Sequence, residues 1–449
     1  MPAGGGLLQL VATGKQDLFL TGNPQISFFK MVYRRHTNFA TEAQPMYFDG
    51  TPNFGQRITC LIPRRGDLLG RVYLDVTLPR VYDTSGNVIS YTNSVGHALI
   101  AEITFEVGEQ EIDRQTGEWM EIWTQLTTPA GQRDALNEMI GRFEPYYPPY
   151  LVPGENSEGL RLLIPLQFYF CRNPGLYLPL LALQYHPIRI NITLRPLQQL
   201  FWMPPPVGIS QEDWKPACQV NVDCTSQIVN MMLWGEYVYL DVEERRMFVS
   251  KSHEYLIEQV QYTPPYAITG QQTTATVSVE FNHPIKEFMF VAQRDEMENR
   301  NEWFNYSNRA IDEPIPTYVQ SYMNSNAPSG RMDLIASAKL QLDVYDRFMA
   351  RGPQYFRLQQ PYEHHSTTPV QSFIYNYCFA LRPEDVQPTG SMNASRIDSI
   401  VWQIQMNPIL SNPQIPSWQQ RGNCHIVIYG HNYNVFRVIN GFGGLLFTI

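Results

Sequence analysis

The stretch Leu233-Trp-Gly-Glu-Tyr-Val-Tyr-Leu-Asp-Val-Glu-Glu-Arg-Arg-Met-Phe248 lies near the middle of the chain and decides how the chain divides. Tyr237–Leu240 is aromatic and β-branched, which favours a strand. Asp241 follows where a helix N-cap is expected, and Glu244 comes three residues later, with basic residues behind it, in the charge order that a helix macrodipole favours. Extended chain begins again at His253–Ile257. We therefore predict a short helical joint between two strand-rich halves.

Composition favours two domains built from strands. At 449 residues the chain exceeds one ordinary core, and two domains of about 200 residues each fit the usual size of a β-sandwich. The 34 prolines and 29 glycines, spread along the chain, suit short strands joined by many turns. The net charge of −9 is shared by two mildly acidic halves. This argues against a dedicated nucleic-acid binder, which would carry a basic stripe.

The second half repeats the strand order of the first. Ile335–Leu342, followed by Asp346-Arg347, echoes Ile100–Val107, followed by Asp113-Arg114. Two further segments match in the same order. Phe373–Tyr377 with Ser395–Trp402 echoes the block from Phe168 to Leu194, and His425–Tyr429 stands where Tyr237–Leu240 stood. Three pieces in one order predict a tandem duplication of one β-sandwich.

Two short helices are predicted as insertions packed on the first sandwich. Each shows apolar residues at helical spacing, namely Trp119, Ile122, Trp123 and Leu126, then Leu136, Met139, Ile140 and Phe143. The polar segment Asn299–Arg331 is expected to be an exposed loop, whereas Tyr262–Thr276 is a loop of undetermined orientation. Gly441–Gly444 is expected to be a flexible C-terminal turn.

Cysteine usage and the N-terminus predict a protein made in the cytosol. Six cysteines (Cys60, Cys171, Cys218, Cys224, Cys378 and Cys424) lie mostly in apolar runs, which indicates buried thiols. Cys218 and Cys224 are close enough to bridge, but nothing requires it. The chain has no CxxC pair, no basic n-region before its first apolar run and no run of about 20 apolar residues.

Five blocks of the sequence carry a family resemblance. They are Leu10–Lys30 with Tyr33–Phe39; Asn173–Leu176 with Leu183–His186; Tyr239–Asp241, Glu244-Arg245 and His253–Glu258; Pro388–Gly390 with Asn393 and Ser395–Asp398; and Tyr433–Arg437 with Gly441–Gly444. These blocks resemble the double jelly-roll major capsid proteins of nucleocytoplasmic large DNA viruses, which include phycodnavirus, iridovirus and mimivirus members. No single block is decisive, but five in register over most of the chain are specific.

The resemblance implies an all-β fold of two tandem eight-stranded jelly rolls with short helical insertions. It divides the chain into an N-terminal arm (1–25), jelly roll 1 (26–240), the helical joint (241–256) and jelly roll 2 (257–449). It also implies a structural protein whose homotrimers form pseudo-hexagonal capsomers that tile an icosahedral shell. Expected partners are neighbouring capsomers, minor capsid and penton proteins, and the inner membrane at the arm, which is mildly basic over residues 1–40, without specific nucleic acid. The expected location is the virion, assembled in the host cytoplasm.

The candidate chemical groups favour structure over catalysis, and we predict no catalytic, cofactor or metal site. Glu118 and Glu121 beside Trp119 and Trp123 could form a carbohydrate site, but helical spacing predicts buried tryptophans and acids that mostly face water. His364-His365 stands in a polar loop without supporting carboxylates, which favours a surface loop over a metal site. Glu243–Arg246 is predicted to be a solvated, capped helix.

Three sequons occur at Asn191, Asn305 and Asn393. Asn191 lies in a predicted strand, so only Asn305, the most loop-like, and Asn393 remain as glycosylation candidates, and the absence of a secretory signal disfavours both. Two alternatives to a major capsid subunit stay open at this point. One is a minor double jelly-roll capsid paralogue. The other, from a different class, is a two-domain β-sandwich protein that binds or cleaves carbohydrate.

Overall fold

A computed structural model describes residues 9–79, 90–142, 159–202, 227–309, 331–411 and 422–448. The chain separates into a small unit, Met1–Asn38, and a large unit, Phe39–Ile449. In the small unit, residues 9–38 are exposed and include the short helix α2 (Leu18–Thr21). Several of its large apolar side chains, including Phe28 and Phe29, are almost fully exposed.

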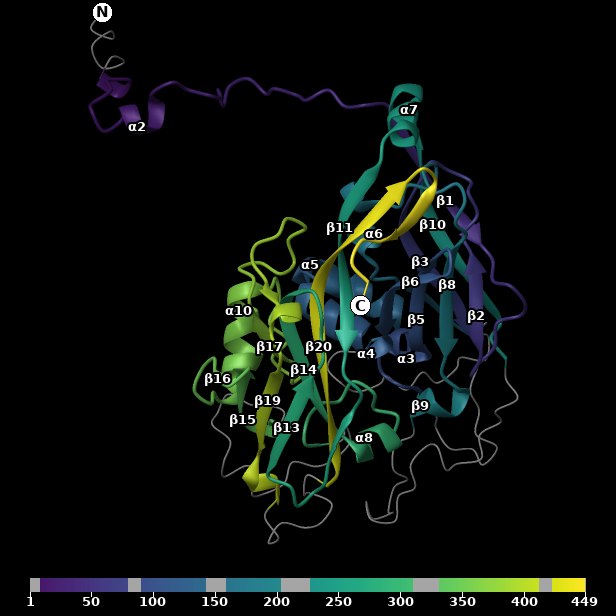
Figure 1. Cartoon of the computed structure of the whole chain (residues 1–449), viewed down its shortest axis with the longest axis vertical. Helices are drawn as coiled ribbons and strands as arrows, with labels where there is room; N and C mark the ends of the chain where they lie inside the picture. The colour runs from purple at the N-terminus through teal and green to yellow at the C-terminus, as the bar shows by residue number, and fades with distance from the viewer. Residues whose placement is uncertain are drawn as a thin grey trace, which may run out of the picture. The chain divides into compact units, whose positions relative to one another are not determined.

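The first half of the large unit is a sandwich of two four-stranded antiparallel sheets (Figure 1). One sheet has the order β1-β10-β3-β7, and the other has the order β2-β8-β5-β6. Their bounds are β1 (Phe39–Met46), β2 (Arg57–Leu61), β3 (Leu68–Leu78), β5 (Ile100–Val107), β6 (Gln110–Thr116), β7 (Leu160–Pro165), β8 (Ile188–Leu194) and β10 (Asn230–Leu240). A separate short pair joins β4 (Ser90–Tyr91) to β9 (Phe201–Trp202).

The second half is a sandwich of the same design. One sheet has the main path β11-β20-β14-β17 and the other has the order β13-β19-β15-β16. Their bounds are β11 (His253–Tyr262), β13 (Thr274–Val279), β14 (Pro284–Arg294), β15 (Ile335–Leu342), β16 (Tyr345–Asp346), β17 (Tyr375–Cys378), β19 (Ile400–Met406) and β20 (Cys424–Ile439). Three short strands extend the first sheet: β12 (Tyr266–Ile268), β18 (Met392–Asn393) and β21 (Phe442–Leu445).

The two strand orders correspond one to one, which supports the predicted duplication. Replacing β1, β10, β3 and β7 by β11, β20, β14 and β17 reproduces one sheet, and the other sheet follows in the same way. The two halves therefore share eight corresponding strands in two sheets, the jelly-roll arrangement that the sequence resemblance implied. The predicted echo of Ile100–Val107 by Ile335–Leu342 places β5 and β15 at equivalent positions.

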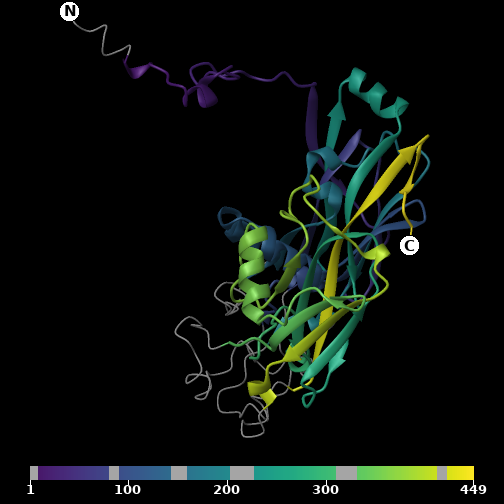
Figure 2. The same cartoon turned by 60° about the vertical axis from the view of Figure 1, so that its left-hand side comes forward.

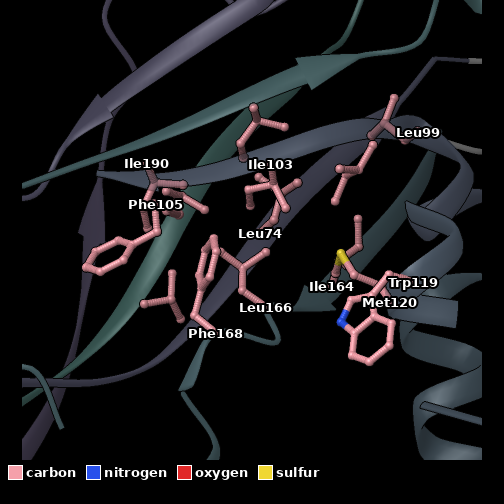
Figure 3. Packing of buried hydrophobic residues seen from close by; sticks show 14 of the residues in the cluster. Leu74, Leu99, Ile103, Phe105, Trp119, Met120, Ile164, Leu166, Phe168 and Ile190 are labelled. Atoms are coloured by element: carbon pink, nitrogen blue, oxygen red, sulfur yellow. The ribbon is translucent and has the colours of Figure 1, made fainter. Parts of the chain in front are cut away.

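The strands form because their apolar residues alternate with polar ones. In β8, for example, Ile190 and Ile192 are fully buried, and in β5 Ile103 and Phe105 face the same core. Figure 3 shows Leu74, Leu166 and Phe168 packed in this core, with Trp119 at one end of it. A second core fills jelly roll 2 around Trp402, with Phe288, Phe290 and Phe356 packed at 5.0 to 6.0 Å between ring centroids.

Both predicted helical insertions exist, although they differ in burial. They are α4 (Gly117–Thr127), which is buried along most of its length, and α5 (Ala130–Ile140), of which only Ile140 is buried. The joint helix α7 (Val242–Ser250) begins at the predicted N-cap, because Asp241 Oδ1 accepts a hydrogen bond from the backbone N–H of Val242. The remaining described α-helices are α3 (Val95–Leu99), α6 (Tyr169–Arg172), α8 (Asp295–Asn299) and α10 (Gln360–His364), the last preceded by a π-helical turn, Tyr355–Gln359.

Two sequence-based expectations about local structure are wrong. The expected loop Tyr262–Thr276 contains β12 and the start of β13. Gly441–Gly444 is no flexible turn, because Phe442 opens β21, which pairs with β20.

The expected exposed loop Asn299–Arg331 is also wrong in its described part. Residues 301–309 are all buried, and residues 310–330 lie outside the described residues. Thr92 Oγ1 donates to the Asn301 carbonyl (2.5 Å), and Trp303 Nε1 donates to the Gln199 carbonyl (2.8 Å). These polar residues are buried because jelly roll 1 supplies their hydrogen-bond partners.

A glycine opens α4 where two backbone carbonyls leave no room for a side chain. A Cβ at Gly117 would lie 2.2 Å from the His97 carbonyl oxygen and 2.4 Å from that of Ile100. We expect Gly117→Ala to lower the free energy of unfolding by about 3 kcal/mol, because backbone cannot move aside as a side chain can. Denaturant unfolding followed by circular dichroism measures this loss.

Gly131→Ala is the matched control, since Gly131 lies in α5 with open space around it. Alanine is the better helix former, so this variant is expected to unfold within about 1 kcal/mol of the wild type. Equal effects of the two substitutions would contradict the close packing of α4.

Candidate functional site: the seam between the jelly rolls

The seam is the buried contact where β6, α4 and α6 of jelly roll 1 meet β11, β14 and β20 of jelly roll 2. At its centre the edge strands β6 and β11 lie side by side without forming a continuous sheet. Asp113 Oδ1 accepts a hydrogen bond from the Val260 N–H (3.2 Å), and Gln259 Nε2 donates to the Ile112 carbonyl. Burial raises the pKa of Asp113 to about 6. Side chains therefore satisfy two edges that would otherwise be exposed to foreign strands.

Aromatic rings fill the seam beside these edges. The Trp119 ring lies 5.8 Å from the Tyr429 ring, and the Trp123 ring meets His431 edge to face at 4.8 Å. Tyr429 and His431 belong to β20, so both faces of α4 are covered and the helix is buried nearly all round. Figure 1 shows β20 running the length of jelly roll 2 beside β11. The C-terminal part of β20, with Phe436, belongs to the core of jelly roll 1.

A network of paired charged and histidine side chains begins at the seam. Arg172 of α6 pairs with Glu258 of β11 at 2.8 Å, and its guanidinium lies 4.2 Å from the centroid of the Trp123 ring. Glu258 also pairs with the buried Lys286 and with His431 Nε2, at 3.2 Å for the histidine. Together the contact with His431 and the charges of Lys286 and Arg172 hold the pKa of Glu258 well below its usual range, although burial alone would raise it.

This network of side chains continues from His431 into jelly roll 2. His431 Nδ1 contacts Glu287 Oε1 at 3.1 Å, and Glu287 Oε2 contacts His365 Nε2 at 2.8 Å. His365 Nδ1 then reaches Glu384 at 2.9 Å. Burial works against a charged His365, but the two carboxylates outweigh it and raise its pKa to about 9. These charges are buried as pairs, which is the arrangement that makes buried charge tolerable.

A second buried network lies at the N-terminal side of α4. His97 Nδ1 contacts Glu121 Oε2 at 2.6 Å, and Arg142 approaches Glu121 Oε1 at 3.5 Å. Burial alone would raise the pKa of Glu121, but the Arg142 charge and the His97 hydrogen bond outweigh it and lower the pKa to about 2. Nearby, Arg195 pairs with Glu118 while its guanidinium stacks 4.0 Å from the centroid of the Trp303 ring.

The C-terminal strand also joins the two halves. The Tyr185 N–H donates to the Gly441 carbonyl (3.1 Å), and the Leu445 N–H donates to Gln110 Oε1 (3.1 Å). Gly441 has φ +86°, a conformation that glycine adopts without strain, and a Cβ there would lie 2.6 Å from the Tyr185 ring. Jelly roll 2 is therefore fastened to jelly roll 1 by its own last strand.

The predictions about α4 are half correct. Trp119 and Trp123 are buried as expected, but the expectation that the neighbouring acids face water is wrong. Glu121 is 1% exposed and is paired with His97 and Arg142, and Glu118 is mostly buried against Arg195. Helical spacing could not reveal this because the partners that bury the two acids, His97, Arg142 and Arg195, all come from outside α4. A sugar cannot reach Glu121, so the carbohydrate-site hypothesis loses one of its two acids.

The expectation for His364-His365 is wrong for His365. Its side chain is fully buried between Glu287 and Glu384, so a supporting carboxylate pair exists. His364 keeps partial exposure, with Nδ1 3.0 Å from the Leu381 carbonyl oxygen. Sequence pattern could not reveal this pair because Glu287 precedes His365 by 78 residues.

The other singled-out residues are dispersed. Asn305 is buried and its Nδ2 donates to the Arg309 carbonyl, Asn191 is buried in β8, and Asn393 is exposed. The Glu243–Arg246 helix has no buried residue, as predicted. Cys60, Cys171 and Cys378 are free thiols, and Cys424 is buried. Cys218 and Cys224 lie outside the described residues.

Among the described residues, no helix is both long and apolar enough to span a membrane. Two sandwiches of one strand order, fused through a buried seam, define the class of double jelly-roll coat proteins. Comparison with known proteins supports this class over the whole chain. A family model of the major capsid protein N-terminus matches residues 27–241, and a model of the large eukaryotic DNA virus major capsid protein matches residues 244–444.

Similar proteins and solved structures support the same class. The chain is 36% identical to the major capsid protein of Pyramimonas orientalis virus, covering 99% of this chain and 100% of the relative. It is 32% identical to the major capsid protein of Paramecium bursaria Chlorella virus 1, covering 99% of both. The quasi-atomic model of the PBCV-1 virus capsid matches with a TM-score of 0.68 and 27% identity, covering 94% of this chain and 100% of that one. The chain belongs to the family of major capsid proteins of large eukaryotic DNA viruses.

The Glu121 network predicts an acid-sensitive contribution to stability. Because the pKa of Glu121 is lower when folded, its contribution is complete above pH 4.5 and is lost as the pH falls from about 4.5 to about 2. Glu121→Gln leaves Arg142 and His97 without their carboxylate, so we expect a loss of about 3 kcal/mol at pH 7. The gap between variant and wild type should close toward pH 2, as measured by denaturant unfolding across pH.

Glu243→Gln provides the control, since Glu243 is exposed on α7 and pairs only loosely with Arg246. This variant should follow the wild-type pH profile throughout. A gap between Glu121→Gln and the wild type that stayed constant from pH 7 to pH 2 would contradict the assigned ionisation of Glu121.

Proposed function

We propose that three copies of this chain form a capsomer with a pseudo-hexagonal outline and that capsomers tile an icosahedral shell. The observation that carries the proposal is the repetition of one eight-stranded fold, held side by side in one chain by the seam. Three such chains supply six similar blocks, and six similar blocks approximate a hexagon. The role is structural, and we assign no residue a catalytic function.

We further propose a division into the arm (1–25), jelly roll 1 (26–240), the joint (241–256) and jelly roll 2 (257–449). The two family matches, which end at residue 241 and resume at residue 244, support a joint at this place. Neighbouring capsomers are the main partners. Minor capsid and penton proteins, and an inner membrane at the arm, are the proposed further partners, with assembly in the host cytoplasm.

Residues 9–38, which include the described part of the arm and the residues that follow it, support such contacts by their composition. Leu10, Phe19, Phe28, Phe29 and Met31 are each at least 86% exposed, and basic residues lie among them. Side chains of this kind are more stable when covered by a partner or by lipid. The arm carries no proposed contact with specific nucleic acid.

The edge of jelly roll 2 supports contact between subunits. The short edge strand β16 pairs only with β15 among the described strands, and Val344, Tyr345 and Met349 beside it are at least 78% exposed. An edge strand with exposed apolar side chains is vulnerable to unwanted pairing unless another surface covers it. We propose that a second copy of the chain covers it in the trimer.

Light scattering after size exclusion tests the oligomer. Three chains of 51.8 kDa give about 155 kDa, and we expect the wild type to elute as this trimer. Replacing Val344 and Met349 together by Asp should shift the mass toward one chain, because charge would then be buried in the contact. The double variant should keep the wild-type circular dichroism spectrum.

Val242→Asp is the matched control, since Val242 is 55% exposed on α7, away from β16. It should leave the trimer intact. A wild type of 51.8 kDa would count against the trimer itself, whereas a trimer unaffected by the β16 double variant would count only against this contact.

A further inference from the structure

We propose that Glu287, His365 and Cys378 bind a zinc ion in jelly roll 2, with Asn376 as the fourth ligand. Glu287 Oε2, His365 Nε2 and Cys378 Sγ all lie within 4.8 Å of one another. The side chains of Glu287 and His365 are fully buried at this site, which lies at the end of the network of charged and histidine side chains that starts in the seam. The inference is independent of the trimer and concerns how jelly roll 2 is held together.

Strand pairing brings three of these ligands together. Glu287 of β14 is directly opposite Cys378 of β17 in the antiparallel register, and Asn376 lies two residues before Cys378. Residues two apart on a strand share a face, so the three side chains point to one side of the sheet. His365 follows α10 and enters from above the same face, with its side chain fully buried. Figure 2 shows α10 beside these strands.

The spacing of the ligand atoms fits a tetrahedral ion. Cys378 Sγ lies 3.6 Å from Glu287 Oε2 and 4.0 Å from His365 Nε2, and the last two atoms are 2.8 Å apart. Ligand atoms around zinc, at bond lengths of about 2.0–2.3 Å, lie roughly 3.3–3.6 Å from one another. Small side-chain rotations would bring the three distances to these values. Asn376 Oδ1, 3.1 Å from the sulfur, is placed to complete the set.

Hydrogen bonding alone does not satisfy this cluster. His365 Nε2 lies 2.8 Å from a carboxylate oxygen, an acceptor, and 2.5 Å from Asn376 Nδ2, a donor. One ring nitrogen cannot both donate and accept, and reversing the Asn376 amide would instead set its oxygen 2.9 Å from Glu287 Oε2. A cation at the centre removes the conflict, because nitrogen, oxygen and sulfur would all direct lone pairs to it. When the ion binds, the Cys378 thiol and the protonated Nε2 of His365 would each release a proton to solvent.

The surroundings resemble the outer shell of a metal site. The other ring nitrogen of His365, Nδ1, is held by the Glu384 carboxylate at 2.9 Å, as metal-ligating histidines commonly are. The second oxygen of Glu287 is held by His431. A thiolate with an imidazole selects zinc over magnesium or calcium, which prefer oxygen ligands. The ion would tie α10 and β17 to β14, and through His431 to the seam.

Metal analysis and cobalt substitution of the full-length protein test the site. After loading with zinc and gel filtration, the wild type is expected to hold one more zinc per chain than Cys378→Ser. With Co²⁺ as the probe, the wild type should show a sulfur-to-cobalt charge-transfer band in the near ultraviolet that Cys378→Ser lacks. Zinc should raise the unfolding temperature of the wild type by a few degrees and leave that of Cys378→Ser unchanged.

Cys171→Ser is the matched control, because Cys171 is a free thiol outside the cluster and its loss should leave the cobalt band in place. His365→Gln should weaken zinc binding while keeping the sulfur. A wild type without a sulfur-to-cobalt band overturns the proposal even if Cys378→Ser fails to fold. A band that persists in Cys378→Ser also overturns it, since the metal would then lie elsewhere.

Discussion

The structure depends on the pairing of buried charges that runs from α6 of jelly roll 1 into jelly roll 2. Glu258 of β11 and Glu287 of β14 lie on the two strands that flank β20, and each is held by cationic or histidine partners on both sides. Removing one member would leave its partner charged and buried, which costs far more than a surface pair contributes. The two jelly rolls are thereby fixed in one relative position by charge geometry as well as by apolar packing.

Duplication alone would give two sandwiches connected only by a linker. What makes them one block is a set of features in which they differ. α4 is inserted only between the described strands β6 and β7, and its tryptophans pack on β20. β20 is 16 residues long, and its second part joins the core of jelly roll 1. Residues 301–309 and the strand β21 reach back from jelly roll 2 to close the contact.

Such rigidity suits a shell subunit. A capsomer edge transmits load between neighbours. If the two halves of a subunit could rotate relative to each other, the angle between neighbouring capsomers would vary. The seam excludes that rotation with hydrogen bonds that need one register, such as that between Asp113 and the Val260 N–H. The low charge content of the chain, 17%, is concentrated in part into these buried pairs.

The sequence predicted what depends on local pattern. Ile335–Leu342 is a strand with the predicted bounds, and Asp241 caps the joint helix, because alternation and capping act over a few residues. The buried positions of His365 and Glu121 could not be predicted, since their partners lie 78 and 24 residues away.

Polar composition also led to a wrong prediction of exposure for another segment. Residues 301–309 are polar and were expected outside, yet backbone carbonyls of the other jelly roll pair with them. Composition cannot distinguish a polar segment that water solvates from one that the protein itself satisfies.

Hydrogen exchange of the purified protein, followed by mass spectrometry, tests most directly whether the seam makes one unit of two sandwiches. If the seam is as stable as the cores, peptides from β6, α4 and β11 should exchange as slowly as those from β5 and β15. They should also lose protection together with them as denaturant rises. Fast exchange along the seam, with each sandwich protected separately, would contradict the account.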